Sequence, residues 1–365
     1  MASVKKRFIE IDIIKAFAIS AILVAHLSQY ISTMPFLTWI SYALTNLGTG
    51  LFTFASGFSL SHSTSFEEQF RPLDFVKKRV FRIYPLYVPA LFLFILMFHY
   101  LELYHHLDFA PVWLNTLVHL VGGQALLYPK VSQSFTLWYI GLIIPLYLCF
   151  IAIASCKTRL QRFLVAGGIA VALCTAHGLF GIIDVRMFLH YPIFIAGILA
   201  NRIGILSSRR IGGALALITL PVCIGSYVAY KTLWLLPVQN QYCGAWFCEC
   251  APSLALIATM MASGVMFWLW ASSQLRTRMS KRTRGLVLFL SIGSYGTYLY
   301  HRPLFSFAAW CLESMGNQRS AIRIATYTIL LVAALFVGYG IQSLEKRIMQ
   351  RVIKDRTRPA GTATQ

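Results

Sequence analysis

Three ionisable residues share the first apolar segment of the chain: Asp12, Lys15 and His26. Lys15 and His26 are eleven residues apart, so an α-helix places them on one face, about 16 Å apart along its axis. Asp12 lies three residues before Lys15, close enough to pair with it. A neutral imidazole can take a proton from a hydroxyl or accept a group covalently. The spacing predicts a polar stripe with a cation at one end and a base or nucleophile at the other. The alternative is a snorkelling lysine and a structural histidine.

A second histidine lies in a late apolar segment, SYGTYLYHRPLF (294–305). We expect His301 at about the depth of His26, with Tyr298 one turn away, and therefore a buried polar site between the two segments. Trp138 and Tyr139 could stack on a sugar ring at the same side of the protein. The alternative for all four is an aromatic and polar belt at the membrane surface, a level that Tyr and Trp favour.

Two arginines one helical turn apart occur in RVFRIYP (79–85). We expect a short helix that ends where Tyr84 and Pro85 begin the next apolar segment. Guanidinium groups at i and i+3 can hold a phosphate through paired hydrogen bonds, so Arg79 and Arg82 are candidate phosphate ligands. The alternative is ordinary basic residues on the cytoplasmic side of a membrane protein.

The composition identifies the elements that must position these residues. Of the 365 residues, 58% are hydrophobic and 12% are charged, with a mean hydropathy of +0.66. A soluble surface needs about 25% charged residues, which excludes a soluble enzyme, a disordered chain and a repeat solenoid. We predict an all-α, polytopic transmembrane bundle. It has one membrane domain, residues 1–345, and a short, basic, flexible cytoplasmic tail, residues 346–365.

About ten segments are long and apolar enough to span a bilayer, which takes roughly 20 residues. They are Ile11–Tyr30, Leu44–Ser61, Tyr84–Tyr100, Phe135–Ala154, Phe163–Leu179, Ile182–Ala200, Gly212–Tyr230, Pro252–Ala271, Leu286–Trp310 and Ile322–Leu344. Only a tight turn at Asp184 and Arg186 separates the fifth from the sixth. Val112–Tyr128 is amphipathic, and we interpret it as a re-entrant or interfacial helix.

The distribution of basic residues predicts the orientation. With ten spans, 25 of the 32 Lys and Arg residues fall in segments on one side and five on the other. This asymmetry is the positive-inside pattern and puts both termini in the cytoplasm. The net charge of +20 then reflects topology and contact with anionic membrane lipid, and nucleic acid is not an expected partner. Asp12 and Lys15 within the first apolar segment favour an uncleaved span over a signal peptide.

The eight cysteines contain no CxxC pair, so we expect no zinc or redox site and no bound metal. Cys243, Cys248 and Cys250 belong to the predicted outer loop Lys231–Ala251, where a disulfide can form. Three cysteines leave one over, and the sequence does not choose a pair.

Several motifs resemble those of the acyltransferase type 3 family of multi-pass membrane O-acyltransferases. IDIIKAFAISAILVAH (11–26) is similar to the family's opening signature, a basic residue followed by ten residues and then histidine. The later landmarks occur in family order: FTFASGFSLS (52–61), RVFRIYP (79–85), LWYIGLIIPLY (137–147), YPIFIAGILANR (191–202) and SYGTYLYHRP (294–303). The likeness covers nearly the whole chain. Lys15 replaces the more usual arginine, and the soluble domain that some relatives carry at the C-terminus is not expected here.

The resemblance implies transfer of an acyl group from cytoplasmic acyl-coenzyme A (acyl-CoA) to a hydroxyl of a cell-surface or lipid-linked glycan, in a multi-pass protein of the cytoplasmic (inner) membrane. Acetyl is the default acyl group because it is the commonest in that family. His26 would be the catalytic histidine, either as general base or as acyl carrier, with Lys15 in the same signature. Arg79 and Arg82 would contact the coenzyme's phosphates. Acyl-CoA would be a co-substrate, with no cofactor permanently bound.

Two other functions compete with this interpretation. A transporter or flippase of lipid-linked glycans would also have about ten spans and buried charge, but it favours inverted repeats, and the two halves of the chain show no internal similarity. A receptor or scaffold leaves Asp12, Lys15 and His26 without a role. The acceptor and the oligomeric state are not predicted.

Overall fold

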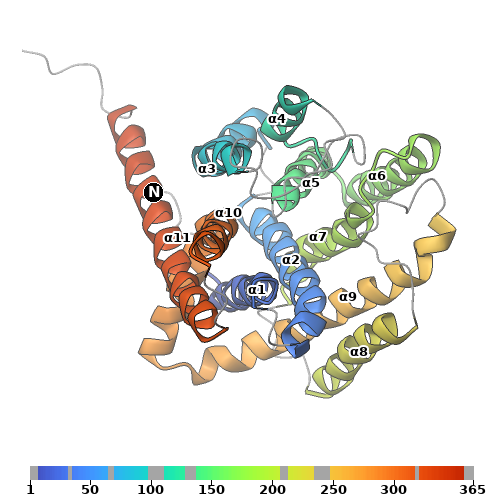
Figure 1. The fold of residues 1–365 in the computed structure, drawn as a ribbon. Coiled ribbons are helices and arrows are strands. Elements are labelled where there is room, and N and C mark those ends of the chain that lie inside the picture. The colour runs from blue at the N-terminus through green and yellow to red at the C-terminus, as the bar shows by residue number, and fades with distance from the viewer. Residues whose placement is uncertain are drawn as a thin grey trace, which may run out of the picture.

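The described part of the chain is helical and contains no strand. The computed structural model describes residues 7–31, 35–64, 70–97, 111–127, 137–205, 213–233, 247–316 and 320–356. Its helices are α1 (Ile9–Leu27), α2 (Pro35–Ser63), α3 (Pro72–Ile95), α4 (Val112–Val121), α5 (Trp138–Ala154), α6 (Arg159–Phe180), α7 (Arg186–Arg202), α8 (Gly213–Thr232), α9 (Phe247–Arg278), α10 (Lys281–Ser314) and α11 (Ser320–Arg356) (Figure 1). The predicted all-α class is confirmed.

Each of the ten predicted spans overlaps one of these helices, and α4 falls in the segment interpreted as amphipathic. Among the described residues, four helices are long and apolar enough to cross a membrane: α6, α8, α9 and α11. The other predicted spans are shorter, more polar or more charged: α5 and α7 have 17 residues each, and α1 carries Glu10, Asp12 and Lys15. The ten-span topology therefore stays a prediction.

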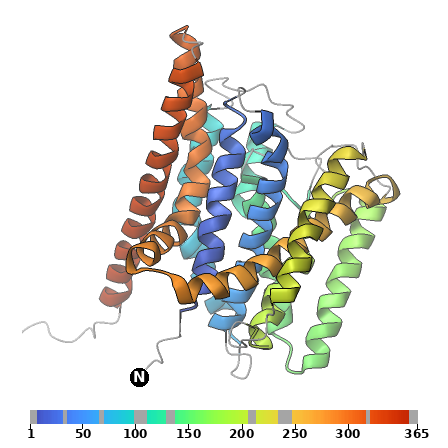
Figure 2. The ribbon, with the colours of Figure 1, turned by 90° about the horizontal axis from the view of Figure 1, so that it is seen from below.

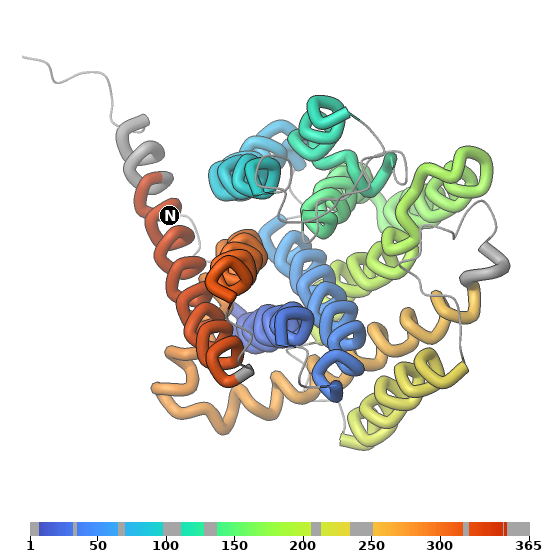
Figure 3. Tube along the Cα trace, viewed as in Figure 1, coloured from blue at the N-terminus to red at the C-terminus, as the bar shows by residue number. Residues whose placement is uncertain are grey.

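Helix α1 lies inside the bundle and carries the first candidate residues. It packs against α2, α9 and α10, while α10 packs against α11 and α2 against α7 (Figures 1 and 3). Two glycines permit the α2–α7 contact, because a Cβ at Gly57 would overlap the carbonyl of Phe194 and one at Gly197 would overlap the carbonyl of Phe54. Small residues of this kind let membrane helices approach closely.

Figure 2 shows the helices of the bundle side-on. Helix α9 crosses the bundle obliquely, and the start of α1 and the end of α11 lie at the same end (Figure 2). Helix α11 continues to Arg356, so it extends into the predicted tail. The pairing of Cys243, Cys248 and Cys250 falls outside the residues whose side chains the structure describes.

The expectation of a short helix that ends at Tyr84 and Pro85 is wrong. Helix α3 runs without a break from Pro72 to Ile95, with Pro85 and Pro89 inside it. A proline removes one backbone hydrogen bond, but membrane helices tolerate it where neighbouring helices support the local backbone. Here the hydroxyls of Tyr295 and Tyr300 on α10 donate to the carbonyls of Ile83 and Leu86, at 2.9 and 3.0 Å. These bonds hold the proline-containing stretch of α3 against α10.

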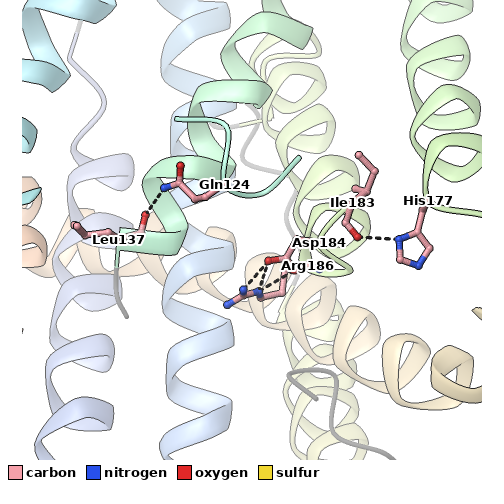
Figure 4. A network of polar contacts seen from close by, with 6 residues as sticks. All are labelled: Gln124, Leu137, His177, Ile183, Asp184 and Arg186. Atoms are coloured by element: carbon pink, nitrogen blue, oxygen red, sulfur yellow. Dashed lines mark hydrogen bonds and ion pairs between the residues drawn. The ribbon is translucent and has the colours of Figure 1, made fainter. Parts of the chain in front are cut away.

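Polar contacts link the segment after α4, the start of α5 and the predicted turn between α6 and α7 (Figure 4). Asp184 accepts two-pronged hydrogen bonds from Arg186, the shortest at 2.6 Å, and the backbone N–H of Asp184 donates to the carbonyl of Ala125 at 2.9 Å. Gln124 donates to the carbonyl of Leu137 at 3.1 Å. The network thus fixes the start of α5, where Trp138 and Tyr139 lie.

Candidate active site

His26 of α1 and His301 of α10 are in direct contact. Nδ1 of His26 lies 2.7 Å from Nε2 of His301, and the two rings are nearly parallel, with centroids 4.9 Å apart and planes 12° apart. His301 is fully buried, and His26 is 6% exposed. The prediction that the two histidines form a buried polar site between their helices is confirmed by this geometry.

The surrounding carbonyls determine which nitrogens carry protons when both rings are neutral. Nδ1 of His301 lies 3.0 Å from the carbonyl oxygen of Thr297 and 2.9 Å from that of Tyr298. A carbonyl oxygen only accepts, so Nδ1 of His301 holds the proton and its Nε2 accepts one from Nδ1 of His26. This leaves Nε2 of His26 unprotonated, and it forms no hydrogen bond with any described residue. The pair therefore presents His26 as a neutral base.

One buried guanidinium with neutral polar partners adjoins the histidine pair. Arg302 follows His301 in α10 and is 8% exposed. Its guanidinium donates to the hydroxyl of Tyr30 at 3.1 Å and to the side-chain oxygen of Gln29 at 2.5 Å. Tyr30 in turn lies 2.9 Å from the hydroxyl of Ser306. A buried guanidinium beside the base can stabilise negative charge that develops during acyl transfer.

The other end of the polar stripe faces a small cavity of about 140 Å³. Lys15, Arg79 and Arg82 all line it, so α1 and α3 bring the three predicted cations together. The ammonium group of Lys15 forms no hydrogen bond or ion pair within the described ranges. The cavity extends to Tyr139 and Tyr298, but His26, His301 and Trp138 are not in its lining. Tyr298 connects the two regions, since its ring centroid is 6.2 Å from that of His301.

A larger cavity of about 410 Å³ adjoins the small one. The two share five lining residues, listed here from α1 to α11: Lys15, Ser59, Arg82, Ser291 and Gln342. The larger cavity adds residues from the start of α1 and the end of α2, including Arg7 and His62. Lys15 and Arg82 therefore lie at the boundary between the two adjoining cavities.

Arg79 is oriented by aromatic rings. Its guanidinium carbon lies 5.3 Å from the centroid of Phe75 and 5.9 Å from that of Tyr147, which is cation–π range. Its Nε is buried and has no hydrogen-bond partner among the described residues. A buried donor without a partner is uncommon in native structures, and here it is consistent with an anion in the small cavity. Arg82 is an exposed residue, whereas Arg79 is only partly exposed.

Asp12 does not form the expected pair with Lys15. Its carboxylate accepts two hydrogen bonds from Arg7, at 2.6 and 2.8 Å, and one from the hydroxyl of Ser291 at 2.6 Å. The fork of a guanidinium matches both carboxylate oxygens, and Lys15 lines the cavity instead. Asp12 lies fourteen residues before His26, or about 21 Å along the helix. The structure thus brings Asp12 to the cation end of the stripe and not to the histidines.

The comparison with protein families now bears directly on these residues. A family model described as an acyltransferase domain matches residues 8–342, which include every site residue predicted from the sequence. The chain belongs to the acyltransferase type 3 family. No curated protein and no solved structure matches the chain. Family membership and the long apolar helices together identify a membrane acyltransferase.

Sequence reasoning missed one buried histidine of this acyltransferase. His190 of α7 is fully buried, and its Nδ1 lies 2.9 Å from the hydroxyl of Thr53, which is 3.2 Å from the hydroxyl of Tyr139. Thr53 donates its proton to the carbonyl of Thr49 at 2.9 Å, so it accepts from both His190 and Tyr139. The lone pairs of the Tyr139 hydroxyl are then free to accept hydrogen bonds in the small cavity. An ionisable residue inside an apolar span was the signal that could have found His190.

The remaining acceptor-side candidate of the acyltransferase lies apart from the cavity. The ring of Trp138 is covered by the guanidinium of Arg186, 4.1 Å from its centroid, and its centroid lies 5.9 Å from that of His190. Tyr139 and Tyr298 contact each other with centroids 5.7 Å apart. No group of three His, Cys, Asp or Glu side chains in the described ranges is placed to hold a metal ion.

Proposed function

We propose that this membrane acyltransferase moves an acyl group, acetyl in the first instance, from acyl-CoA to a hydroxyl of a cell-surface or lipid-linked glycan. One observation carries the proposal: the hydrogen bond between His26 and His301 leaves an unprotonated nitrogen on α1, and Lys15 of the same helix lines a cavity with Arg79 and Arg82. A base on α1 and a cation of the same helix that meets two arginines of α3 at one cavity suit transfer from a phosphorylated thioester donor.

The cations hold the donor in this proposal. The phosphates of CoA contact Lys15, Arg79 and Arg82, where charge-assisted hydrogen bonds are strongest. The pantetheine arm extends through the small cavity, along α1, toward Tyr298. The hydroxyl of Tyr139 accepts a hydrogen bond from an amide N–H of that arm. The thioester then lies next to the histidine pair.

Chemistry takes place at Nε2 of His26. This nitrogen removes the proton from the acceptor hydroxyl while the oxygen attacks the thioester carbonyl. The new C–O bond forms, the C–S bond breaks, and the leaving thiolate takes up the proton from His26. The imidazolium that exists in between donates its Nδ1–H to Nε2 of His301, and Arg302 faces the oxyanion. In the alternative route Nε2 attacks the thioester carbonyl, a C–N bond replaces the C–S bond, and CoA leaves as the thiolate. The acceptor oxygen then attacks the acyl-imidazole, the C–N bond breaks, and the thiolate takes up the hydroxyl proton.

We place the protein in the cytoplasmic membrane as one membrane domain, residues 1–345, with a basic tail, residues 346–365. The excess of Lys and Arg on one side of the ten predicted spans supports cytoplasmic termini. Acyl-CoA then binds Arg79 and Arg82 from the cytoplasmic side of the membrane, and the acceptor glycan binds from the opposite side. Acyl-CoA is a co-substrate, and surrounding lipid is the remaining partner.

Labelled acetyl transfer tests the proposal directly. Purified wild-type protein in detergent is incubated with acetyl-CoA labelled on the acetyl group and a set of lipid-linked or soluble glycans, and the products are identified by mass spectrometry. The proposal expects a gain of one acetyl group on an acceptor hydroxyl and release of free CoA. Protein that moves a lipid-linked glycan across vesicle membranes without using any acyl-CoA would support the transporter instead.

A further inference from the structure

The larger cavity has walls that the proposed reaction does not use. Beyond the residues it shares with the small cavity, its lining includes Arg7 and Phe8, which directly precede α1, and Phe58 and His62 near the end of α2. Its volume of about 410 Å³ lies within the usual range for small-molecule sites. The phosphates and the pantetheine arm are already placed, so the space is free for another part of the donor.

The aromatic wall of this cavity suits a planar heterocycle. The ring of Phe8 makes edge-to-face contacts with Phe58, at 5.4 Å between centroids and 87° between planes, and with His62, at 4.9 Å and 81°. The rings of Phe8 and His62 thus meet nearly at right angles, and a base can stack on one of them while its edge meets the other. Stacking on aromatic side chains is a general way of binding nucleobases.

The two cavities differ in the charges of their lining residues, and this difference favours phosphate in one place and the nucleoside in another. The small cavity is lined by three cations and, in the described part of the chain, by no carboxylate. The larger cavity has Arg7, Lys15 and Arg82 but also Asp12 and Glu345. These two carboxylates offset part of the positive charge of the larger cavity, so it suits an uncharged sugar and base better than the small cavity does. A densely phosphorylated group therefore belongs at the shared boundary, and a sugar and base belong in the larger space.

Arg7 offers one further contact for an anion. Its Nε and Nη2 bind Asp12, and its Nη1 forms no hydrogen bond with the described residues. The pairing with Asp12 fixes the guanidinium plane at the cavity wall. One pre-oriented N–H pair of this kind is suited to a single phosphate monoester.

We infer that the larger cavity binds the 3′-phosphorylated adenosine of acyl-CoA. The adenine stacks against His62 and Phe8, the 3′-phosphate contacts Arg7, and the diphosphate lies at the boundary formed by Lys15 and Arg82. The small cavity then takes the pantetheine arm. This assignment rests on the proposed use of acyl-CoA and specifies which half of the donor each cavity binds.

Three donors of decreasing size test the assignment: acetyl-CoA, 3′-dephospho-acetyl-CoA, which lacks only the 3′-phosphate, and S-acetylpantetheine, which lacks the adenosine and the diphosphate as well. His62→Ala should raise the KM for acetyl-CoA about tenfold through loss of a stacking contact, with kcat and the KM for S-acetylpantetheine unchanged. His62→Phe keeps a ring and should restore the wild-type KM. Arg7→Gln keeps a donor for Asp12 and should raise the KM for acetyl-CoA but not for the 3′-dephospho donor. Trp113→Ala removes an exposed ring elsewhere, at 67% exposure, and is the matched control.

Adenosine 3′,5′-bisphosphate gives a second measurement that does not depend on any variant. It carries the nucleoside half alone and should compete with acetyl-CoA in wild-type protein but not with S-acetylpantetheine bound in the small cavity. Equal KM changes for all three donors in His62→Ala, or absence of competition by the bisphosphate, would overturn the assignment. If wild-type protein transfers acetyl from none of the three donors, the proposed function itself fails. That result is distinct from equal KM changes in His62→Ala and from absence of competition by the bisphosphate.

Discussion

Nδ1 of His26 and Nε2 of His301 are 2.7 Å apart, and this bond connects α1 to α10 in the interior of the bundle. Two backbone carbonyls hold the proton of His301 on its other nitrogen. The position of these two carbonyls on α10 therefore determines which nitrogen of His26 is unprotonated and can act as a base. The proposed reaction uses a base that is oriented before any substrate arrives.

The double change Arg79→Ala plus Arg82→Ala should raise the KM for acyl-CoA tenfold or more. Each lost charge-assisted hydrogen bond is worth about 1.5–3 kcal/mol, and both side chains line the small cavity. Arg282→Ala plus Arg284→Ala is the matched control, because it also removes two positive charges but from exposed positions outside both cavities. Equal donor constants in the two double variants would make Arg79 and Arg82 ordinary basic residues of the cytoplasmic side.

Lys15→Arg should retain most activity, whereas Lys15→Ala should raise the donor KM. The Lys15 ammonium forms no hydrogen bond or ion pair within the described ranges and faces a cavity with two arginines, so its charge is available to a phosphate. An arginine keeps that charge. Steady-state kinetics with acetyl-CoA check this, and an unchanged KM in Lys15→Ala would return Lys15 to the snorkelling interpretation.

His301→Ala should reduce kcat by less than the loss of His26 does, because His301 acts through His26. His301→Gln should recover part of the activity, since its side-chain oxygen can accept the Nδ1–H of His26 in place of Nε2. The measurement is kcat at several pH values for the three proteins. Identical losses in His301→Ala and His301→Gln, with unchanged pH profiles, would mean that His301 only fills space.

Gly57→Ala and Gly197→Ala should each destabilise the protein, by about 1–3 kcal/mol as is typical for overpacking. In both cases the added carbon meets a backbone carbonyl of the facing helix, which cannot move aside as a side chain can. Gly167→Ala is the control, because nothing lies within 4 Å of its Cβ position and alanine is the better helix former. Thermal unfolding in detergent should rank Gly167→Ala at or above wild type and the other two below it.

The sequence predicted the helices and the central pair for identifiable reasons. Apolar runs of sufficient length define membrane helices, and ionisable residues inside them are costly enough to single out His26 and His301. Positive charge concentrated next to a span singled out Arg79 and Arg82. These signals are local to one segment, and the structure adds how the segments face one another.

The sequence did not predict contacts that depend on competition between partners. Spacing alone allowed Asp12 to pair with Lys15, but Arg7 offers a two-pronged match and Ser291 of a distant helix adds a third bond. Where α3 continues through Pro85, its neighbouring carbonyls bond tyrosines of α10, more than 200 positions later. Tertiary packing determines which partner each of these groups bonds, and a local sequence pattern carries no information on it.

The central claim is that His26 is the base or acyl carrier, and acyl transfer by His26→Ala tests it most directly. The variant should bind CoA as wild type does, because the proposed phosphate site lies at the other end of α1. Removing a general base costs about 10²–10⁴-fold in rate, and removing an acyl carrier leaves no turnover. His177→Ala is the control, since His177 is a buried histidine of α6 that bonds the carbonyl of Ile183, outside the lining of either cavity.

The measurement is transfer of labelled acetyl from acetyl-CoA by purified, folded protein, alongside CoA binding by the same samples. The account predicts undetectable or at least hundredfold slower transfer in His26→Ala, roughly the smallest loss expected for a missing general base, with CoA binding intact and His177→Ala active. Near-normal transfer by well-folded His26→Ala protein would contradict it.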